Sequence, residues 1–242
     1  RQELSLQLSL GAALLAGRGW GALERGGALD RALVLSQTTD VGGPRQLFST
    51  LSGFISYYVG RGESRAAHDL AERLLSLAQQ AADPRYMAVA HGLLGATWLN
   101  LGELTTGRSH FEQAIEQYDA QQAGSPDSQA LMETGAARRV WLGLALWALG
   151  YPDQALARSR EALAEARGLG DALTLAFVLA LGMTLHHLRR EGEAAQSQTE
   201  ELTRLAGEKG LAMYHAWGVF YQGLRQTEQG QFATGIDLMR QG

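Results

Sequence analysis

The sequence predicts an all-α protein built as an α-solenoid, an array of antiparallel helix pairs. Apolar residues recur three and four positions apart, as in Leu70, Leu74 and Leu77, which is the spacing of one helix face. No stretch sustains the two-residue alternation of a half-buried strand. Breaks between apolar runs also return at a nearly constant interval, which is typical of repeat proteins.

Prolines mark three of the predicted helix starts: Pro44, Pro84 and Pro152. Proline is tolerated in the first turn, where its missing N–H would have no partner in any case. The breaks then divide the chain into about six helix pairs, the last of them truncated, which form one helical-repeat domain over 1–242 cut from a longer chain. The expected pairs are 1–40, 44–82, 84–120, 131–168, 171–209 and 211–242.

One position inside the turn of each pair fixes the period. Three of the four intervals between these turn residues are 40 residues and one is 48, the excess falling in a loop around 123–127. A period held to the residue across three intervals indicates a true repeat. The turn residues are Gly62, Gly102, Gly150, Arg190 and Gly230.

Small residues flank each turn residue at fixed distances. Seven before it stand Gly95, Gly143 and Gly223, and five after it stand Ala67, Gly107, Ala155, Ala195 and Gly235. Small residues facing one another let the two helices of a pair approach closely. Twelve after the turn residue, side chains should pack on the following pair, and four before it bulky ones fill the remaining space. These residues are Leu74, Ala114, Ala162 and Leu202, and Tyr58, Trp98 and Leu146.

The pattern resembles the tetratricopeptide repeat, with a period of about 40 instead of 34 residues. It is most complete in the run ALWALGYPDQALARSREAL at 145–163. The longer period is similar to the helical-repeat regions of large bacterial signal-transduction ATPases. These include maltose-regulator-like transcription activators and predicted ATPases fused to adenylate or guanylate cyclase domains. The resemblance covers most of the chain and implies a right-handed superhelix that serves in binding.

Two parts of the chain depart from this pattern. In the fifth pair, Arg190 stands where the other turns carry glycine, and His186 stands where an aromatic residue is expected. The first pair, around Gly11 and Ala32, carries extra glycines between positions 17 and 27. An irregular turn is therefore expected in the first pair.

Composition and motifs argue against several classes of function. The net charge is -4 with interspersed signs, and there are no cysteines. We therefore expect no direct nucleic-acid partner, no membrane association and a cytoplasmic location. No phosphate-binding loop, nucleophile elbow or metal-binding histidine spacing occurs. No enzyme activity, catalytic residue, metal or cofactor is expected.

The predicted function is a protein-interaction, scaffold or sensory module of a multidomain bacterial regulator. Its concave groove would bind a peptide, a partner protein or a neighbouring domain. The alternative is a small-molecule effector domain of a transcription activator, with Trp147 stacking on the ligand. The uncapped last pair could also join copies end to end. The predicted groove residues are Ser52, Ser56, Asn100, Leu144, Trp147, Phe177, Thr184, His187, Trp217, Phe220 and Thr227.

Overall fold

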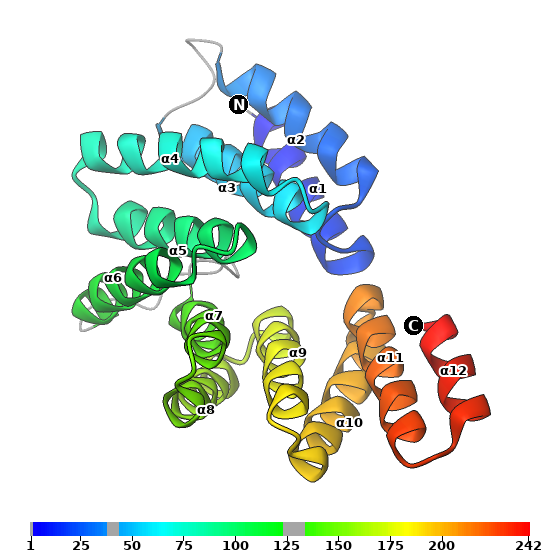
Figure 1. Ribbon diagram of the computed structural model, residues 1–242. Coiled ribbons are helices and arrows are strands. Elements are labelled where there is room, and N and C mark those ends of the chain that lie inside the picture. Colours follow the sequence, from blue (N-terminus) through cyan, green and yellow to red (C-terminus); the bar gives the residue numbers. More distant parts are fainter. Residues whose placement is uncertain (1, 38–43, 123–133) are drawn as a thin grey trace. The chain divides into compact units, whose positions relative to one another are not determined.

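The computed structural model describes residues 2–37, 44–122 and 134–242, and the loop predicted at 123–127 lies outside them. These described residues form twelve α-helices and no strand (Figure 1). The chain divides into two compact units, residues 1–133 and 134–242. The predicted all-α fold of paired helices is confirmed.

Unit 1 contains three helix pairs, each helix packing on the next along the chain. Its core is an apolar cluster contributed by the second and third pairs and including Ile55, Leu74 and Leu93. The helices are α1 (Gln2–Arg18), α2 (Leu23–Ser36), α3 (Pro44–Gly60), α4 (Ser64–Ala81), α5 (Pro84–Asn100) and α6 (Leu104–Gln122).

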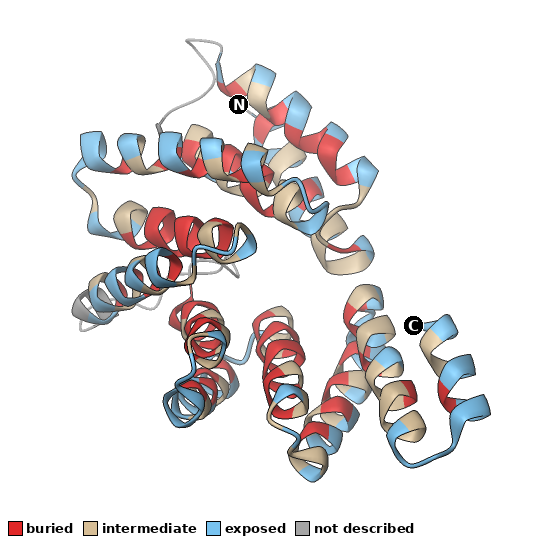
Figure 2. Ribbon diagram, in the orientation of Figure 1, coloured by how far each residue is buried: buried red, intermediate tan, exposed pale blue. Residues whose placement is uncertain are grey.

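Unit 2 contains the other three pairs. Its central helix carries the longest buried run of this unit, 176–183, because helices from all three pairs pack around it. Figure 2 shows this burial on the central helix, α9. The helices are α7 (Gly135–Ala148), α8 (Pro152–Leu169), α9 (Ala172–Leu188), α10 (Gly192–Lys209), α11 (Ala212–Glu228) and α12 (Phe232–Gln241).

Every predicted turn residue ends the first helix of its pair in the left-handed conformation. The four glycines have φ between 74° and 86°, and Arg190 has φ 59°. The N–H of the turn residue donates to the carbonyl three positions back, at 2.9–3.1 Å, and the next N–H donates to the carbonyl five positions before it, at 2.9–3.0 Å. These two hydrogen bonds are the Schellman motif. The period thus arises because five helices end in the same way.

The small residues predicted to face one another do so. A Cβ atom on Gly143 would lie 3.1 Å from the carbonyl oxygen of Ala155, and one on Gly223 would lie 2.6 Å from that of Gly235. The residues twelve positions after the turn are also fully buried, at 0% exposure: Leu74, Ala114, Ala162 and Leu202. The spacing rules derived from sequence therefore describe real helix contacts.

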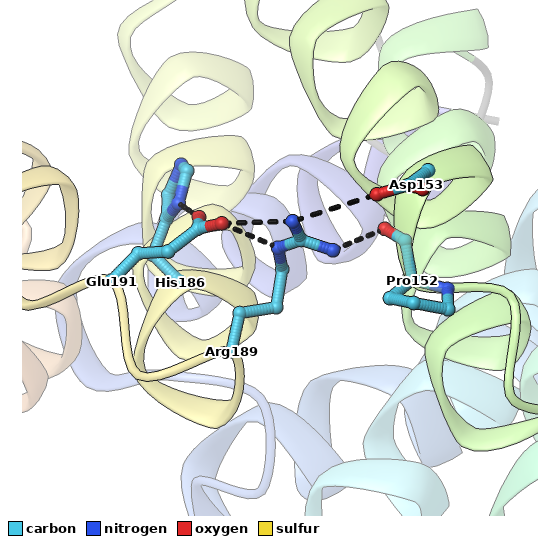
Figure 3. A network of polar contacts seen from close by, with 5 residues as sticks. All are labelled: Pro152, Asp153, His186, Arg189 and Glu191. Atoms are coloured by element: carbon cyan, nitrogen blue, oxygen red, sulfur yellow. Dashed lines mark hydrogen bonds and ion pairs between the residues drawn. The ribbon is translucent and has the colours of Figure 1, made fainter.

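Side chains at the turn of the fifth pair form a network that reaches the neighbouring helix α8 (Figure 3). Arg189 donates to Glu191 Oε1 at 2.8 Å and to the carbonyl oxygen of Pro152 at 2.5 Å, and His186 Nδ1 lies 2.7 Å from Glu191 Oε2. The hydrogen bond from Arg189, followed by that from His186, lowers the pKa of the Glu191 carboxyl. The network ties this turn to the start of α8. Both departures from the repeat pattern, Arg190 and His186, therefore lie in or beside one polar cluster.

The helix ends follow the sequence signals closely. Pro44, Pro84 and Pro152 each begin a helix. The first pair turns instead at Gly19, which has φ 95°. The Gly19 N–H donates to the carbonyl oxygen of Leu15, so this turn is irregular as predicted.

None of the helices in the described part of the chain combines the length and hydropathy that a membrane span requires.

Candidate functional site

The three predicted groove residues of unit 1 all form hydrogen bonds within that unit. Ser56 is buried and accepts a hydrogen bond from the Arg25 guanidinium at 2.7 Å, and burial lowers the pKa of Arg25 to about 10. Ser52 donates to the carbonyl oxygen of Phe48 at 2.9 Å. Asn100 is exposed. Ser56 therefore offers no surface to a ligand in this conformation.

The predicted groove residues of unit 2 fall into three groups. Phe177 is only 3% exposed, with its ring centroid 6.2 Å from that of Trp141, so it belongs to the core. Four others are half-buried and spread over α7 and α11: Leu144, Trp147, Trp217 and Thr227. The remaining three come together around a residue that the sequence reasoning missed.

That residue is Tyr221, on α11. Its hydroxyl donates to Thr184 Oγ1 at 3.1 Å, and the His187 ring meets its edge at a centroid distance of 5.7 Å. Phe220 packs against it at 5.9 Å and is 39% exposed, while His187 Nδ1 lies 3.4 Å from Glu228 Oε1. The available sequence signal was the aromatic pair at positions 220 and 221.

A cleft of about 960 Å³ adjoins this cluster inside unit 2. It is lined by the end of α9, the first half of α10, the second half of α11 and one residue of α12. Among the predicted groove residues, His187 lines it. The full lining is His187, Leu188, Arg190, Gly192, Glu193, Ala195, Gln196, Thr199, Glu200, Tyr221, Gln222, Arg225, Gln226, Glu228, Gln229 and Leu238.

Polar side chains dominate this α9–α12 cleft. Four of its lining residues are glutamines, and its ionic groups are three carboxylates and two guanidiniums. Gln222 Nε2 donates to Thr203 Oγ1 at 3.3 Å. Two buried atoms, Gln226 Oε1 and Arg225 Nε, have no hydrogen-bond partner within the described structure. The cleft therefore offers hydrogen-bonding groups of both kinds and little net charge.

The repeat register explains why a polar cleft opens at this place. Eight and four positions before the turn residue, α5 carries Leu94 and Trp98, and α11 carries Gln222 and Gln226. Leu94 is 2% exposed and belongs to the core cluster of unit 1, against which Trp98 packs. At the same positions of the repeat, α11 thus replaces core side chains by amides that prefer contact with water.

Two histidines of unit 1 form a close pair that the sequence reasoning also missed. Nδ1 of His91 lies 2.8 Å from Nδ1 of His110. Burial, reinforced by the nearby His110, lowers the pKa of His91 to about 4, and burial, with His68, also lowers the pKa of His110. Within residues 2–37, 44–122 and 134–242, no three His, Asp or Glu side chains gather as a metal ion would require. The pair is therefore a neutral hydrogen bond between α5 and α6 near neutral pH.

Neither a protein-family model nor a curated protein sequence matches this chain. Solved structures do. The apo form of RapI is 12% identical, with a TM-score of 0.67 over 99% of this chain and 81% of RapI. A Rap protein in complex with competence and sporulation factor is 11% identical, with a TM-score of 0.65 over 98% of this chain and 74% of the other.

A third structure comes from Pyrococcus horikoshii. It is a signal transduction ATPase with numerous domains and a tetratricopeptide repeat sensor, 15% identical, with a TM-score of 0.56 over 98% of this chain and 35% of the other. At these identities the likeness establishes the fold alone. The chain has the tetratricopeptide-like α-solenoid fold that its repeat pattern predicts.

Proposed function

We propose that this chain is a non-catalytic interaction module of a multidomain, cytoplasmic bacterial regulator, and that it binds a polypeptide partner. Repeat arrays present extended surfaces without reactive groups. Two of the similar structures support the proposal. One is a complex of a Rap protein with a bound factor, and the other is a signalling ATPase with a tetratricopeptide repeat sensor.

One observation favours a polypeptide over a small effector: the chemistry of the α9–α12 cleft. Pockets for small molecules are lined mostly by apolar and aromatic side chains. This cleft is lined by glutamines and charged groups, with Tyr221 and His187 as its rings. Trp147, the aromatic residue that a stacked ligand would need, is outside the lining. The polar lining suits a partner rich in hydrogen-bonding groups.

Self-association through the last helix pair remains a second proposal. Phe232 and Ile236 lie one turn apart on α12 and are 65% and 42% exposed. Sedimentation equilibrium of the chain and of Phe232→Ser would test it. A dimer that the substitution dissociates is expected, and a monomer at all concentrations would contradict it.

The interaction function is tested by selection from a displayed library of random linear peptides, with the immobilised chain as target. Enriched peptides should bind the free chain saturably in isothermal titration calorimetry. Scrambled versions of the same peptides should bind more weakly. If selection enriches no peptide above a blank surface, the proposed function is wrong.

A further inference from the structure

We propose that the α9–α12 cleft is the binding site for this partner, and that it holds an extended segment by the segment's main-chain amide groups. The inference rests on the proposed function and names its site and its mode of recognition. Three features of the cleft carry it: the placement of its glutamines, its unpaired polar atoms and its balance of charge.

The glutamines form a row whose spacing suits an extended chain. Gln222 and Gln226 on α11 and Gln229, the residue that caps its C-terminus, follow one another at intervals of four and three residues, so they share one face, about 5–6 Å apart. Gln196 lines the opposite wall, on α10. Alternate residues of an extended chain are about 6.6 Å apart. Successive glutamines can therefore meet successive outward-facing peptide groups.

A glutamine amide has the same hydrogen-bonding groups as a peptide bond, a carbonyl acceptor and an N–H donor. Gln226 Oε1 and Arg225 Nε are buried without a partner in the described structure, and each such atom costs about 1–3 kcal/mol. The terminal torsion of glutamine is soft, so the Gln226 amide can turn toward a bound segment. Once turned into the cleft, the Gln226 carbonyl oxygen would accept from a peptide N–H, the partner that it lacks in the described structure.

The charges of the cleft favour recognition of the main chain over recognition of charged side chains. The lining contains three carboxylates and two guanidiniums, and Arg225 Nη1 lies 3.4 Å from Glu228 Oε2. Because both signs lie together, the long-range field that steers a charged ligand is weak. We therefore expect a neutral segment to bind, with an affinity that changes little with salt.

The same arrangement has a recognisable origin in the repeat. Gln222 and Gln226 occupy positions that hold core side chains in α5 and α7, where Leu94, Trp98, Leu142 and Leu146 stand. In a purely structural repeat, replacing two apolar side chains on one helix by amides would only destabilise the fold. Binding of a partner in the cleft explains why both replacements lie there.

The test uses the peptide that selection enriches most, measured by calorimetry on the whole chain. Gln229→Ala and Gln226→Ala should each weaken binding about tenfold, the value of one hydrogen bond. The matched control is Gln154→Ala, an exposed glutamine of α8 outside the cleft, which should leave the affinity unchanged. Gln229 is exposed, so its variant folds even if Gln226→Ala does not.

Main-chain recognition has its own readout in the peptide. Methylation of single backbone nitrogens should abolish binding at several positions, while single alanine substitutions in the peptide should change affinity only a few-fold. The opposite pattern, with one side chain dominating and methylation tolerated, would overturn the mode of recognition.

Failure of the inference is distinguishable from failure of the proposed function. An enriched peptide that binds wild type, Gln226→Ala and Gln229→Ala equally would overturn the cleft as the site but leave the interaction function standing. Failure of selection itself would remove both.

Discussion

α5 and α11 begin from the same repeat pattern and end in different surroundings. Each is the first helix of its pair, ends in a Schellman motif at a glycine, and packs on the second helix of the preceding pair. Around α5, Leu93 and Leu94 complete a buried apolar cluster with α3 and α4. Around α11, Gln222 and Gln226 line an open polar cleft.

The difference shows that the repeat contains two sets of residues with separate roles, which we call the frame and the filling. The frame consists of the left-handed turn residue and the small residues at the helix crossing, and both are kept in α11 as Gly230 and Gly223. The filling consists of the side chains four and eight positions before the turn. Because the frame holds the helices together, the filling can change without loss of the fold.

The largest expected effect comes from moving the α11 residue into α5. Leu94→Gln would place an amide without a partner in the core of unit 1, since Leu94 is 2% exposed. The expected loss is about 2–4 kcal/mol of unfolding free energy, the sum of lost apolar burial and an unpaired polar group. Urea denaturation followed by circular dichroism measures it.

The reverse change provides the control. Gln222→Leu faces the cleft and loses one hydrogen bond of 3.3 Å to Thr203, so it should alter the stability by less than about 1 kcal/mol. Equal losses from Leu94→Gln and Gln222→Leu would show that α5 and α11 do not differ as described.

A change in the frame should be costly in any pair. Gly143→Leu would push a side chain against the Ala155 carbonyl, which lies 3.1 Å from a Cβ at that position, and should cost about 1–3 kcal/mol by overpacking. A Cβ on Gly168, in α8, meets nothing within 4 Å, so Gly168→Ala should be neutral or stabilising. An unchanged melting temperature for Gly143→Leu would mean that the crossing is not close.

The histidine pair should make stability depend on pH in unit 1. The pKa of His91 is about 4 in the folded chain, below the value of about 6.5 in an unfolded one. Between these values the unfolded state binds more protons, so stability falls as pH drops from about 6.5 to about 4. A pKa change from about 6.5 to about 4 corresponds to about 3 kcal/mol, so the loss should be about 2–3 kcal/mol for His91 once screening by solvent is allowed for.

Urea denaturation at a series of pH values measures this slope, and His91→Gln should flatten it. The variant keeps a polar side chain beside His110 but removes the titration of His91. A slope of the same size in His91→Gln would place its origin in other groups, of which Glu191, with its lowered pKa, acts only below about pH 4.5.

The smallest expected effect concerns the turn of the fifth pair. Arg190 has φ 59°, a conformation that costs a residue with a Cβ about 1 kcal/mol. Arg190→Gly should therefore raise the unfolding free energy by about 0.5–1 kcal/mol. Gly150→Ala, at φ 86°, should lower it by a similar amount. Differential scanning calorimetry of the two variants compares them, and destabilisation by Arg190→Gly would show that the Arg190 side chain stabilises the turn.

The frame could be predicted from sequence because it depends on local backbone geometry. A left-handed turn favours glycine at one position, and a close crossing needs small residues at two others. The sequence alone therefore identifies the turn residues Gly62, Gly102, Gly150 and Gly230. The same reasoning located the exception at Arg190, although not the contacts of Arg189 that surround it.

The filling could be predicted only in part, because exposure depends on which neighbouring helix covers each side chain. Counting along the first helices placed Ser56 and Phe177 on a groove, and both are buried. It did include His187, which lines the cleft. The signal for the cleft was present in the sequence as Gln222 and Gln226 at apolar positions of the repeat, where a comparison between pairs would have found it.

The most direct test restores the filling of α5 in α11. The double variant Gln222→Leu, Gln226→Trp carries the residues of α5 at the same two positions, and calorimetric titration would compare its affinity for the enriched peptide with that of wild type. We predict an unchanged or higher melting temperature together with the loss of detectable binding. Binding of wild-type strength by this folded variant would contradict the assignment of the cleft.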